Sequence, residues 1–237
     1  PHNIGKAYFC KNSGTGIDKF LDEYLPAYKA THKDGLWCFI TCNHDTIRPS
    51  AGLTTDELRL AYATIFTLPG APFVYYGDEI GMRYLPLPTK EGGYFRTGSR
   101  TPMQWDASKH AGFTQGEPWI NLSDNAADIN VAAALRDTDS VFYTYQKLIA
   151  LRKAEPVITW GDYQDLLPGS PHLWCYQREW QGQRLLVIAN LSDTFQSWQP
   201  TQTDGNWQVL MHNYAEVASQ PTDMTLRPFE AVWWLQK

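Results

Sequence analysis

The feature that most constrains this chain is an apolar stretch, residues 36–41, that ends abruptly in a cluster of amide, imidazole, carboxylate and guanidinium groups. The cluster consists of Asn43, His44, Asp45 and Arg48. An apolar run of this length before a turn predicts a buried strand, here residues 36–42. Barrel and doubly wound folds collect their chemistry at the carboxyl ends of such strands. The cluster is therefore a candidate site, although Asn43 and Asp45 could instead cap the helix that follows.

The sequence on either side predicts a repeated order of helix, strand and polar cluster. The predicted elements are helix 17–31, strand 36–42, helix 50–68, strand 71–76 and helix 139–153. Pro26 should kink or end the first helix. A second polar cluster, residues 77–82, follows the strand 71–76. Parallel strands joined by helices carry their carboxyl ends at one edge of the sheet, so both clusters are expected at that edge.

From residue 157 onward the pattern changes to short apolar runs separated by turns. The runs are Val157–Trp160, Leu173–Arg178, Arg184–Asn190, Trp207–His212 and Ala231–Leu235. Their spacing predicts an antiparallel β-sandwich. We therefore place a domain boundary near residue 155, between an α/β domain (1–155) and an all-β domain (156–237).

Composition excludes several classes of partner. The net charge of −5, with no basic stripe, argues against nucleic acid or an anionic membrane, and no apolar run approaches the roughly 20 residues that span a bilayer.

Cys38 and Cys42 should share one face of the predicted strand, and the absence of a Cys-x-x-Cys pair favours reduced, structural thiols and hence the cytoplasm. Aromatic residues make up 14% of the chain, which fits either sugar-stacking surfaces or core packing. Because the chain starts at Pro1 without an initiator Met, we expect a piece of a longer protein.

Three motifs, in the correct order, resemble the α-amylase superfamily of glycoside hydrolases. They are Asn43-His44-Asp45, then Pro69 to Pro72 with Tyr76 to Met82, and then Arg100-Thr101-Pro102-Met103-Gln104-Trp105-Asp106. The last motif is similar to the α-glucosidase and oligo-1,6-glucosidase branch, with trehalose-forming and sucrose-isomerising relatives nearby. The resemblance covers nearly the whole chain. It implies a fold of class α/β plus all-β, in which the C-terminal part of a (β/α)8 barrel, about strands six to eight, precedes an antiparallel β-sandwich.

The resemblance also implies roles for the candidate residues. Asp45 would be the carboxylate that stabilises the transition state, and Asn43 and His44 would bind the same glucose ring. Arg48 resembles an arginine beside the acceptor sugar, with a surface ion pair as the alternative. Several relatives carry Arg-Asp-Asn where this chain has Arg96-Thr97-Gly98, so Arg96, Arg100 or neither could reach the non-reducing-end glucose. Trp105 is expected in the core.

Retaining glycosidases need a nucleophile and an acid/base carboxyl about 5 Å apart. In this family both precede the region seen here, and residues 1–35 lack an Arg-x-Asp string. The chain therefore resembles one part of an enzyme with one of three catalytic carboxylates, inactive alone, that acts on α-glucoside oligosaccharides without a cofactor or metal. The alternatives are a catalytically dead carbohydrate-binding or assembly module, and a transglycosylating or isomerising relative. Open strand edges invite pairing, so the expected partner is the missing N-terminal part of the barrel or a second copy.

Overall fold

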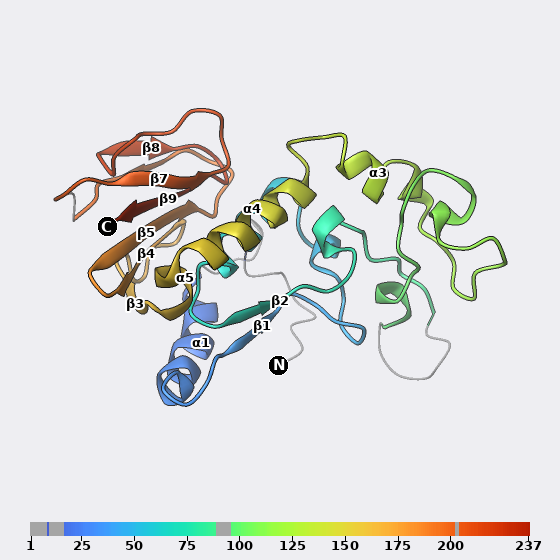
Figure 1. The fold of residues 1–237 in the computed structure, drawn as a ribbon, viewed down its shortest axis with the longest axis horizontal. Helices are drawn as coiled ribbons and strands as arrows, with labels where there is room; N and C mark the ends of the chain where they lie inside the picture. Colours follow the sequence, from blue (N-terminus) through green and yellow to red (C-terminus); the bar gives the residue numbers. More distant parts are fainter. Residues whose placement is uncertain (1–8, 10–16, 89–95, 202–203) are drawn as a thin grey trace. The chain divides into compact units, whose positions relative to one another are not determined.

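The computed structural model describes residues 9, 17–88, 96–201 and 204–237. Its α-helices are α1 (Asp18–Thr31), α2 (Thr55–Ile65), α3 (Val131–Ala134), α4 (Val141–Ala154) and α5 (Pro156–Trp160) (Figure 1). Its strands are β1 (Cys38–Ile40), β2 (Ala71–Phe73), β3 (Asp162–Asp165), β4 (Leu173–Trp180), β5 (Gln183–Asn190), β6 (Gln196–Trp198), β7 (Gln208–His212), β8 (Met224–Leu226) and β9 (Ala231–Gln236). Short 3-10 helices lie at Pro49–Ala51, Asp78–Ile80, Thr97–Ser99, Lys109–Gly112 and Asp124–Ala127. Within the described ranges, no helix combines the length and the apolar character needed to cross a membrane.

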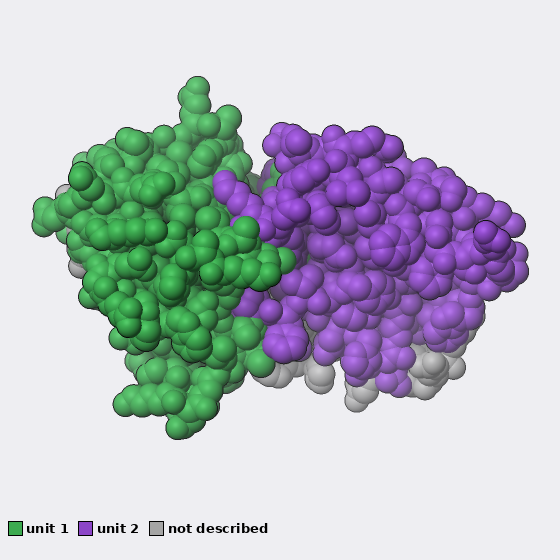
Figure 2. Space-filling view, in the orientation of Figure 1, with its two compact units in different colours: residues 1–38, 59–71, 148–237 green, residues 39–58, 72–147 purple. Residues whose placement is uncertain are grey.

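The chain divides into two compact units, coloured in Figure 2. Unit 1 comprises residues 1–38, 59–71 and 148–237, and unit 2 comprises residues 39–58 and 72–147. The units interleave along the sequence, whereas the predicted boundary near residue 155 divides the chain at one point. That boundary stays a prediction.

Helix α1 does not end at Pro26, but continues to Thr31. Tyr24, two residues before Pro26, is buried and stacks against Phe20 and Tyr28, with ring centroids 5.6 and 5.7 Å away. The Tyr24 hydroxyl also donates to the Pro69 carbonyl at 2.9 Å. A proline inside a helix costs about 3 kcal/mol, and this aromatic packing on both sides of Pro26 offsets that cost.

The pair β1 and β2 is shorter and more exposed than the predicted buried strands. Among the described residues the two strands pair only with each other. Ile40 and Phe73 are each 55% exposed, so the expectation of buried strands is wrong for these side chains. The pairing of Cys38 and Cys42 on one face is also wrong, because β1 ends at Ile40, and Cys38 is exposed while Cys42 is buried.

Two arginines, Arg152 and the buried Arg178, bind carbonyls in the turn after α2 and at the end of α5. Arg152 of α4 donates to the Phe66 carbonyl at 2.7 Å, and Arg178 of β4 donates to the Gly161 carbonyl at 2.9 Å. Their other acceptors are the carbonyls of Thr67, Leu68, Gly70 and Ile158. Burial lowers the pKa of each guanidinium to about 10, so both remain charged at neutral pH. These carbonyls lie just after α2 and at the end of α5, and the two cations supply them with hydrogen-bond donors.

Residues from β3 onward form antiparallel sheets, as the spacing predicts. The larger sheet has the order β3-β4-β5-β9-β7, and β6 pairs with β8 separately (orange to red in Figure 1). One core joins both sheets, since Trp198 of β6 stacks on Trp234 of β9 with ring centroids 5.8 Å apart.

The predicted strand 157–160 is wrong, because these residues form helix α5. Pro156 occupies the first helical position, where its fixed φ and missing N–H favour a helix start. Val157 and Ile158 are fully buried, and α5 packs on β4 and β5. The β-branched residues that suggested a strand therefore supply the core-facing side of one short helix.

Candidate active site

The loop after β1 presents Asp45 to solvent. The Asn43 side chain accepts a hydrogen bond from the Asp45 backbone N–H at 2.8 Å, and the Asn43 N–H donates to the Thr46 hydroxyl at 2.9 Å. Such local side-chain bonds replace helical or sheet pairing and fix a tight turn. Asn43 therefore shapes the turn, and the Asp45 side chain projects from it with 49% of its surface exposed.

Asp45 does not cap the next α-helix. A reciprocal pair caps α2 instead: the Thr54 N–H donates to the Glu57 carboxylate at 2.7 Å, and the Glu57 N–H donates to the Thr54 hydroxyl at 3.3 Å. This is a capping box, which satisfies two of the orphan donors at a helix start. The Asp45 carboxylate is left to other partners.

Both candidate arginines reach Asp45. Its Oδ1 lies 3.2 Å from Arg96 Nη1 and 3.0 Å from Arg100 Nη2, and its Oδ2 lies 3.3 Å from His44 Nε2. The Arg100 Nε also donates to the His44 carbonyl at 2.9 Å. The hydrogen bond from Arg96, followed by the nearby His44 and the bond from Arg100, lowers the pKa of Asp45. Asp45 is therefore an exposed carboxylate held in its ionised form.

Arg48 forms a buried ion pair with Asp78. Its side chain is buried, and its Nη1 lies 3.2 Å from Asp78 Oδ1. Nη1 also donates to the Tyr76 carbonyl at 2.7 Å, and Nη2 donates to the Ser99 carbonyl at 3.2 Å. The ion pair that was the alternative for Arg48 is present, but it is buried rather than on the surface.

Asp78 and Glu79 follow β2, and the pKa values of their carboxyls are shifted in the direction opposite to that of Asp45. Asp78 accepts hydrogen bonds from Thr41 at 2.7 Å and from the Cys42 thiol at 3.3 Å. Burial raises the pKa of both Asp78 and Glu79, and the hydrogen bonds to Asp78 offset part of its shift. The Glu79 Oε2 atom is buried and, within the described part of the chain, has no hydrogen-bond donor.

A cavity of about 360 Å³ lies beside Arg100. Its lining consists of Tyr76, Glu79, Arg100, Pro102, Met103, Trp105, Phe113 and Trp119. The volume falls in the range of sites for small molecules. Trp105 was expected in the core but is 50% exposed, and Trp119 is 60% exposed. Because Arg100 both lines this cavity and bonds Asp45, the cavity and the carboxylate form one candidate site.

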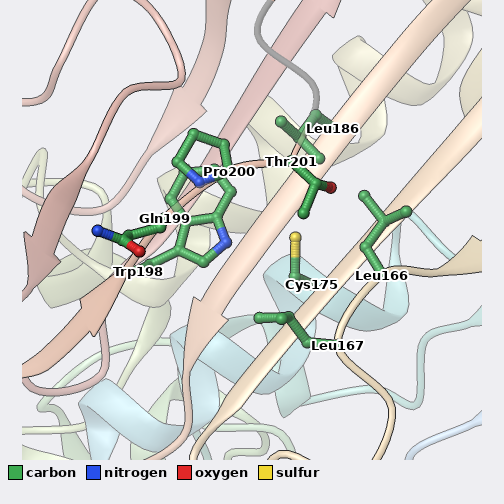
Figure 3. Close-up of a pocket in the computed structure, with 8 residues that line it drawn as sticks. All are labelled: Leu166, Leu167, Cys175, Leu186, Trp198, Gln199, Pro200 and Thr201. Carbon is green, nitrogen blue, oxygen red and sulfur yellow. The ribbon is translucent and has the colours of Figure 1, made fainter.

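A second cavity, among the C-terminal sheets, has no room for a substrate. Its volume is about 10 Å³, which corresponds to at most one water molecule. The Cys175 thiol points into it among leucine and tryptophan side chains (Figure 3). Burial raises the pKa of Cys175, so this thiol is unreactive. The cavity is a packing gap.

The part of the chain that the structure describes has no group of three or more His, Cys, Asp or Glu side chains placed to hold a metal ion. The site consists instead of one ionised carboxylate, two arginines, a histidine and aromatic walls. Such a set can stabilise a developing positive charge and bind hydroxyl groups.

Several residues of this site were missed by the sequence analysis, namely Tyr76, Ser99, Phe113 and Trp119. The position of Tyr76 could have indicated a site residue, because Tyr76 lies at the carboxyl end of the predicted strand 71–76. Asp45 lies just after the carboxyl end of the predicted strand 36–42. Ser99, Phe113 and Trp119 lie in the irregular segment after residue 83, where no periodicity places a side chain.

Comparison with known proteins found one matching family and several similar proteins. The model of the alpha-amylase catalytic domain matches residues 16–161. Trehalose-6-phosphate hydrolase of Escherichia coli K12 is 51% identical over 231 residues, which cover 83% of this chain and 42% of that protein. Oligo-1,6-glucosidase of Heyndrickxia coagulans is 38% identical, over 82% of this chain and 41% of that protein.

A solved structure agrees with these sequence matches. The crystal structure of trehalose-6-phosphate hydrolase from Bacillus licheniformis matches with a TM-score of 0.82 and 30% identity. The match covers 93% of this chain and 46% of that one. The chain thus spans less than half the length of the relatives that it matches.

Proposed function

Because the chain belongs to the alpha-amylase family, we propose that it is the C-terminal part of a retaining glycoside hydrolase that cleaves α-glucosidic bonds in short oligosaccharides. The observation that carries this proposal is the state of Asp45. It follows β1 in the region matched by the catalytic-domain model, and Arg96, Arg100 and His44 surround its ionised carboxylate.

In this proposal, Asp45 stabilises the oxocarbenium-like transition state by its negative charge. The ionised form is needed, and the two arginines maintain it. Arg96, Arg100 and His44 also have donors directed at the Asp45 side of the loop, where sugar hydroxyls would be bound. The nucleophile and the acid/base would come from the part of the relatives that precedes the matched region.

The substrate that we propose first is trehalose-6-phosphate. The relative that is 51% identical carries that name, while the oligo-1,6-glucosidase from Heyndrickxia coagulans is 38% identical. Both names describe enzymes that act on α-glucosidic bonds. The higher identity favours the phosphorylated disaccharide, with isomaltose as the comparison substrate.

The architecture belongs to the same proposal. β1 and β2 would be barrel strands seven and eight, and β3 to β9 would form the sandwich domain. Ile40, Phe73 and Val74 are exposed apolar side chains on or next to these two strands. We propose that the rest of the barrel covers them, because unpaired, apolar strand edges seek further strands.

A hybrid enzyme tests the function. This chain would replace the matching C-terminal segment of the E. coli trehalose-6-phosphate hydrolase, and hydrolysis of trehalose-6-phosphate would be measured. We expect activity in the hybrid, and a loss of about 10²–10³-fold on Asp45→Asn, as for removal of one transition-state-stabilising group in other enzymes. The circular dichroism spectrum and the melting temperature would report whether each hybrid is folded.

The matched control is Asp223→Asn, which neutralises an exposed carboxylate among the C-terminal strands and should leave the rate unchanged. The 237-residue chain alone should release no nitrophenol from an aryl α-glucoside. A folded hybrid that is inert would favour the dead-module alternative. A folded hybrid in which Asp45→Asn is fully active would rule out the proposed role of Asp45.

A further inference from the structure

The buried pair Arg48–Asp78 connects three segments that are distant in the sequence. Asp78 accepts a hydrogen bond from Thr41 at 2.7 Å, in the segment that leads from β1. Arg48 lies on the loop that follows, and its guanidinium bonds the Tyr76 carbonyl after β2 and the Ser99 carbonyl in the segment that precedes Arg100. One guanidinium therefore fixes the loops on which the candidate site depends.

Stability alone does not explain this pair. Both side chains are at most 1% exposed, and the ion pair spans 3.2 Å. Removing two charges from water costs several kcal/mol, and apolar replacements of similar size are often equally stable. The guanidinium also lies 4.9 Å from the ring centroids of Tyr75 and Tyr76, which fixes its plane. The charged pair fixes the positions of the Tyr76 and Ser99 carbonyls, which an apolar pair could not bind.

The link to Asp45 runs through Ser99. The Ser99 carbonyl accepts bonds from Arg48 at 3.2 Å and from the Tyr75 hydroxyl at 3.1 Å, and its hydroxyl donates to the Thr46 carbonyl. The next residue, Arg100, bonds both the His44 carbonyl and the Asp45 carboxylate. The backbone of Ser99 is thus fixed against the Asp45 loop from two sides.

The turn that carries Ser99 is buried and closely packed. Thr97, Gly98 and Ser99 are buried in a single 3-10 turn. A Cβ at Gly98 would lie 1.9 Å from the Leu85 carbonyl oxygen, so the backbone there already touches its neighbour. Arg96 and Arg100 flank this turn, and a displacement of Ser99 would displace both arginines.

We propose that Arg48 and Asp78 are positioning residues, whose buried ion pair holds Ser99 and thereby places Arg96 and Arg100 on the Asp45 carboxylate. The placement itself follows from the contacts of these residues. Its effect on glycoside hydrolysis rests on the proposed function of Asp45.

Titration of Asp45 tests this proposal without any substrate. Among the described residues, the charged and titratable groups that face the Asp45 carboxylate are His44, Arg96 and Arg100. In the 237-residue chain, the carboxyl ¹³C resonance of Asp45 would be followed against pH by NMR. The double variant Arg48→Met/Asp78→Leu removes the pair but keeps the core filled. We expect it to fold, with the pKa of Asp45 raised toward that of an ordinary aspartate.

A milder variant allows the same titration to be measured if the double variant does not fold. Tyr75→Phe removes only the second donor to the Ser99 carbonyl, and we expect a smaller rise of the Asp45 pKa. The matched control is Arg227→Met/Glu230→Leu, which removes an ion pair of 2.6 Å next to β8 and β9 and should leave Asp45 unchanged.

An unchanged Asp45 titration in the folded double variant would overturn the proposal, since the pair would then be structural only. If the double variant is unfolded, an unchanged titration in Tyr75→Phe would overturn it. A hybrid enzyme that fails to hydrolyse trehalose-6-phosphate would not alter these readings, so the two proposals fail separately.

Discussion

At the scale of the residue, the site contrasts three carboxyls on neighbouring loops. The pKa of Asp45 is lowered by Arg96, His44 and Arg100, while burial raises the pKa of Asp78 and Glu79. Environments that separate the pKa values of nearby carboxyls are typical of catalytic sites. The contrast supports the role proposed for Asp45.

The lowered pKa of Asp45 predicts how stability depends on pH. A carboxyl whose folded pKa lies below its unfolded value of about 3.9 stabilises the fold above that value. This contribution is lost as the pH falls through the folded pKa, because the carboxyl is then protonated in both states. Urea denaturation of the wild type and of Asp45→Asn should therefore show a difference in the free energy of unfolding at pH 7 that vanishes in acid. A difference that grows on acidification would contradict this assignment.

The sequence could predict some of these residues and not others. Asp45 and His44 were found because they directly follow an apolar run. The contact of both Arg96 and Arg100 with Asp45 could not be foreseen, because these residues are 51 and 55 positions away in the sequence. The burial of Arg48 could not be foreseen either, since its partner Asp78 lies 30 positions later.

At the scale of the element, the turn after β2 depends on Gly77. Its φ is +88°, and a Cβ there would lie 2.4 Å from the Met82 sulfur. Gly77→Ala should lower the free energy of unfolding by about 2–4 kcal/mol, because the left-handed backbone and the clash add together. Chemical denaturation would measure the change.

Gly81→Ala is the matched variant for that turn. Gly81 has a φ of +69°, but the contact nearest to its Cβ would be Val141 at 3.9 Å. Only the cost of a left-handed backbone remains, and we expect the free energy of unfolding to fall by about 1–2 kcal/mol. Equal losses in the two variants would show that the contact with Met82 does not matter.

A second element-scale prediction concerns the end of α2. Arg178→Met would leave the buried carbonyls of Thr67, Ile158 and Gly161 without this donor. Unsatisfied buried acceptors cost about 1–3 kcal/mol each, and removing the buried charge offsets part of this. We expect the free energy of unfolding, measured by urea denaturation, to fall by about 2–4 kcal/mol, with faster amide exchange at the end of α2.

The control is Arg184→Met. Arg184 lies over the Trp207 ring, and its replacement should change the free energy of unfolding by less than about 1 kcal/mol. A stable Arg178→Met variant would contradict this account.

Long elements were easier to predict than short ones in this chain, for a physical reason. α4 begins and ends within two residues of its prediction, and its buried residues Val141, Tyr145 and Leu148 follow a helical spacing. α5 was predicted as a strand because Val157 and Ile158 are β-branched, and its five residues are too few to show any period. β1 and β2 were located correctly, but burial depends on neighbouring strands, which local sequence does not reveal.

At the scale of the whole molecule, the exposed apolar side chains predict association. Ile40, Phe73 and Val74 are 43–55% exposed on or next to a two-stranded sheet. An open apolar edge promotes pairing between chains. Sedimentation velocity of the 237-residue chain should show a mean mass that rises with concentration, and Ile40→Lys/Phe73→Lys should reduce that rise.

Phe195→Lys, which replaces a residue that is 67% exposed next to β6, is the control for this prediction. It should leave the association unchanged, because it does not alter the β1–β2 edge. If both variants lower the mass equally, general surface hydrophobicity and not this edge drives the association.

The contact of Arg178 with the turn after α2 has a consequence for protein engineering. A cassette exchange between relatives would naturally cut near residue 155 and replace everything beyond it. Arg178 would then come from the donor, while the Thr67 carbonyl that it serves would come from the recipient. A successful chimera therefore has to transfer both sides of that contact or preserve an arginine at this position of β4.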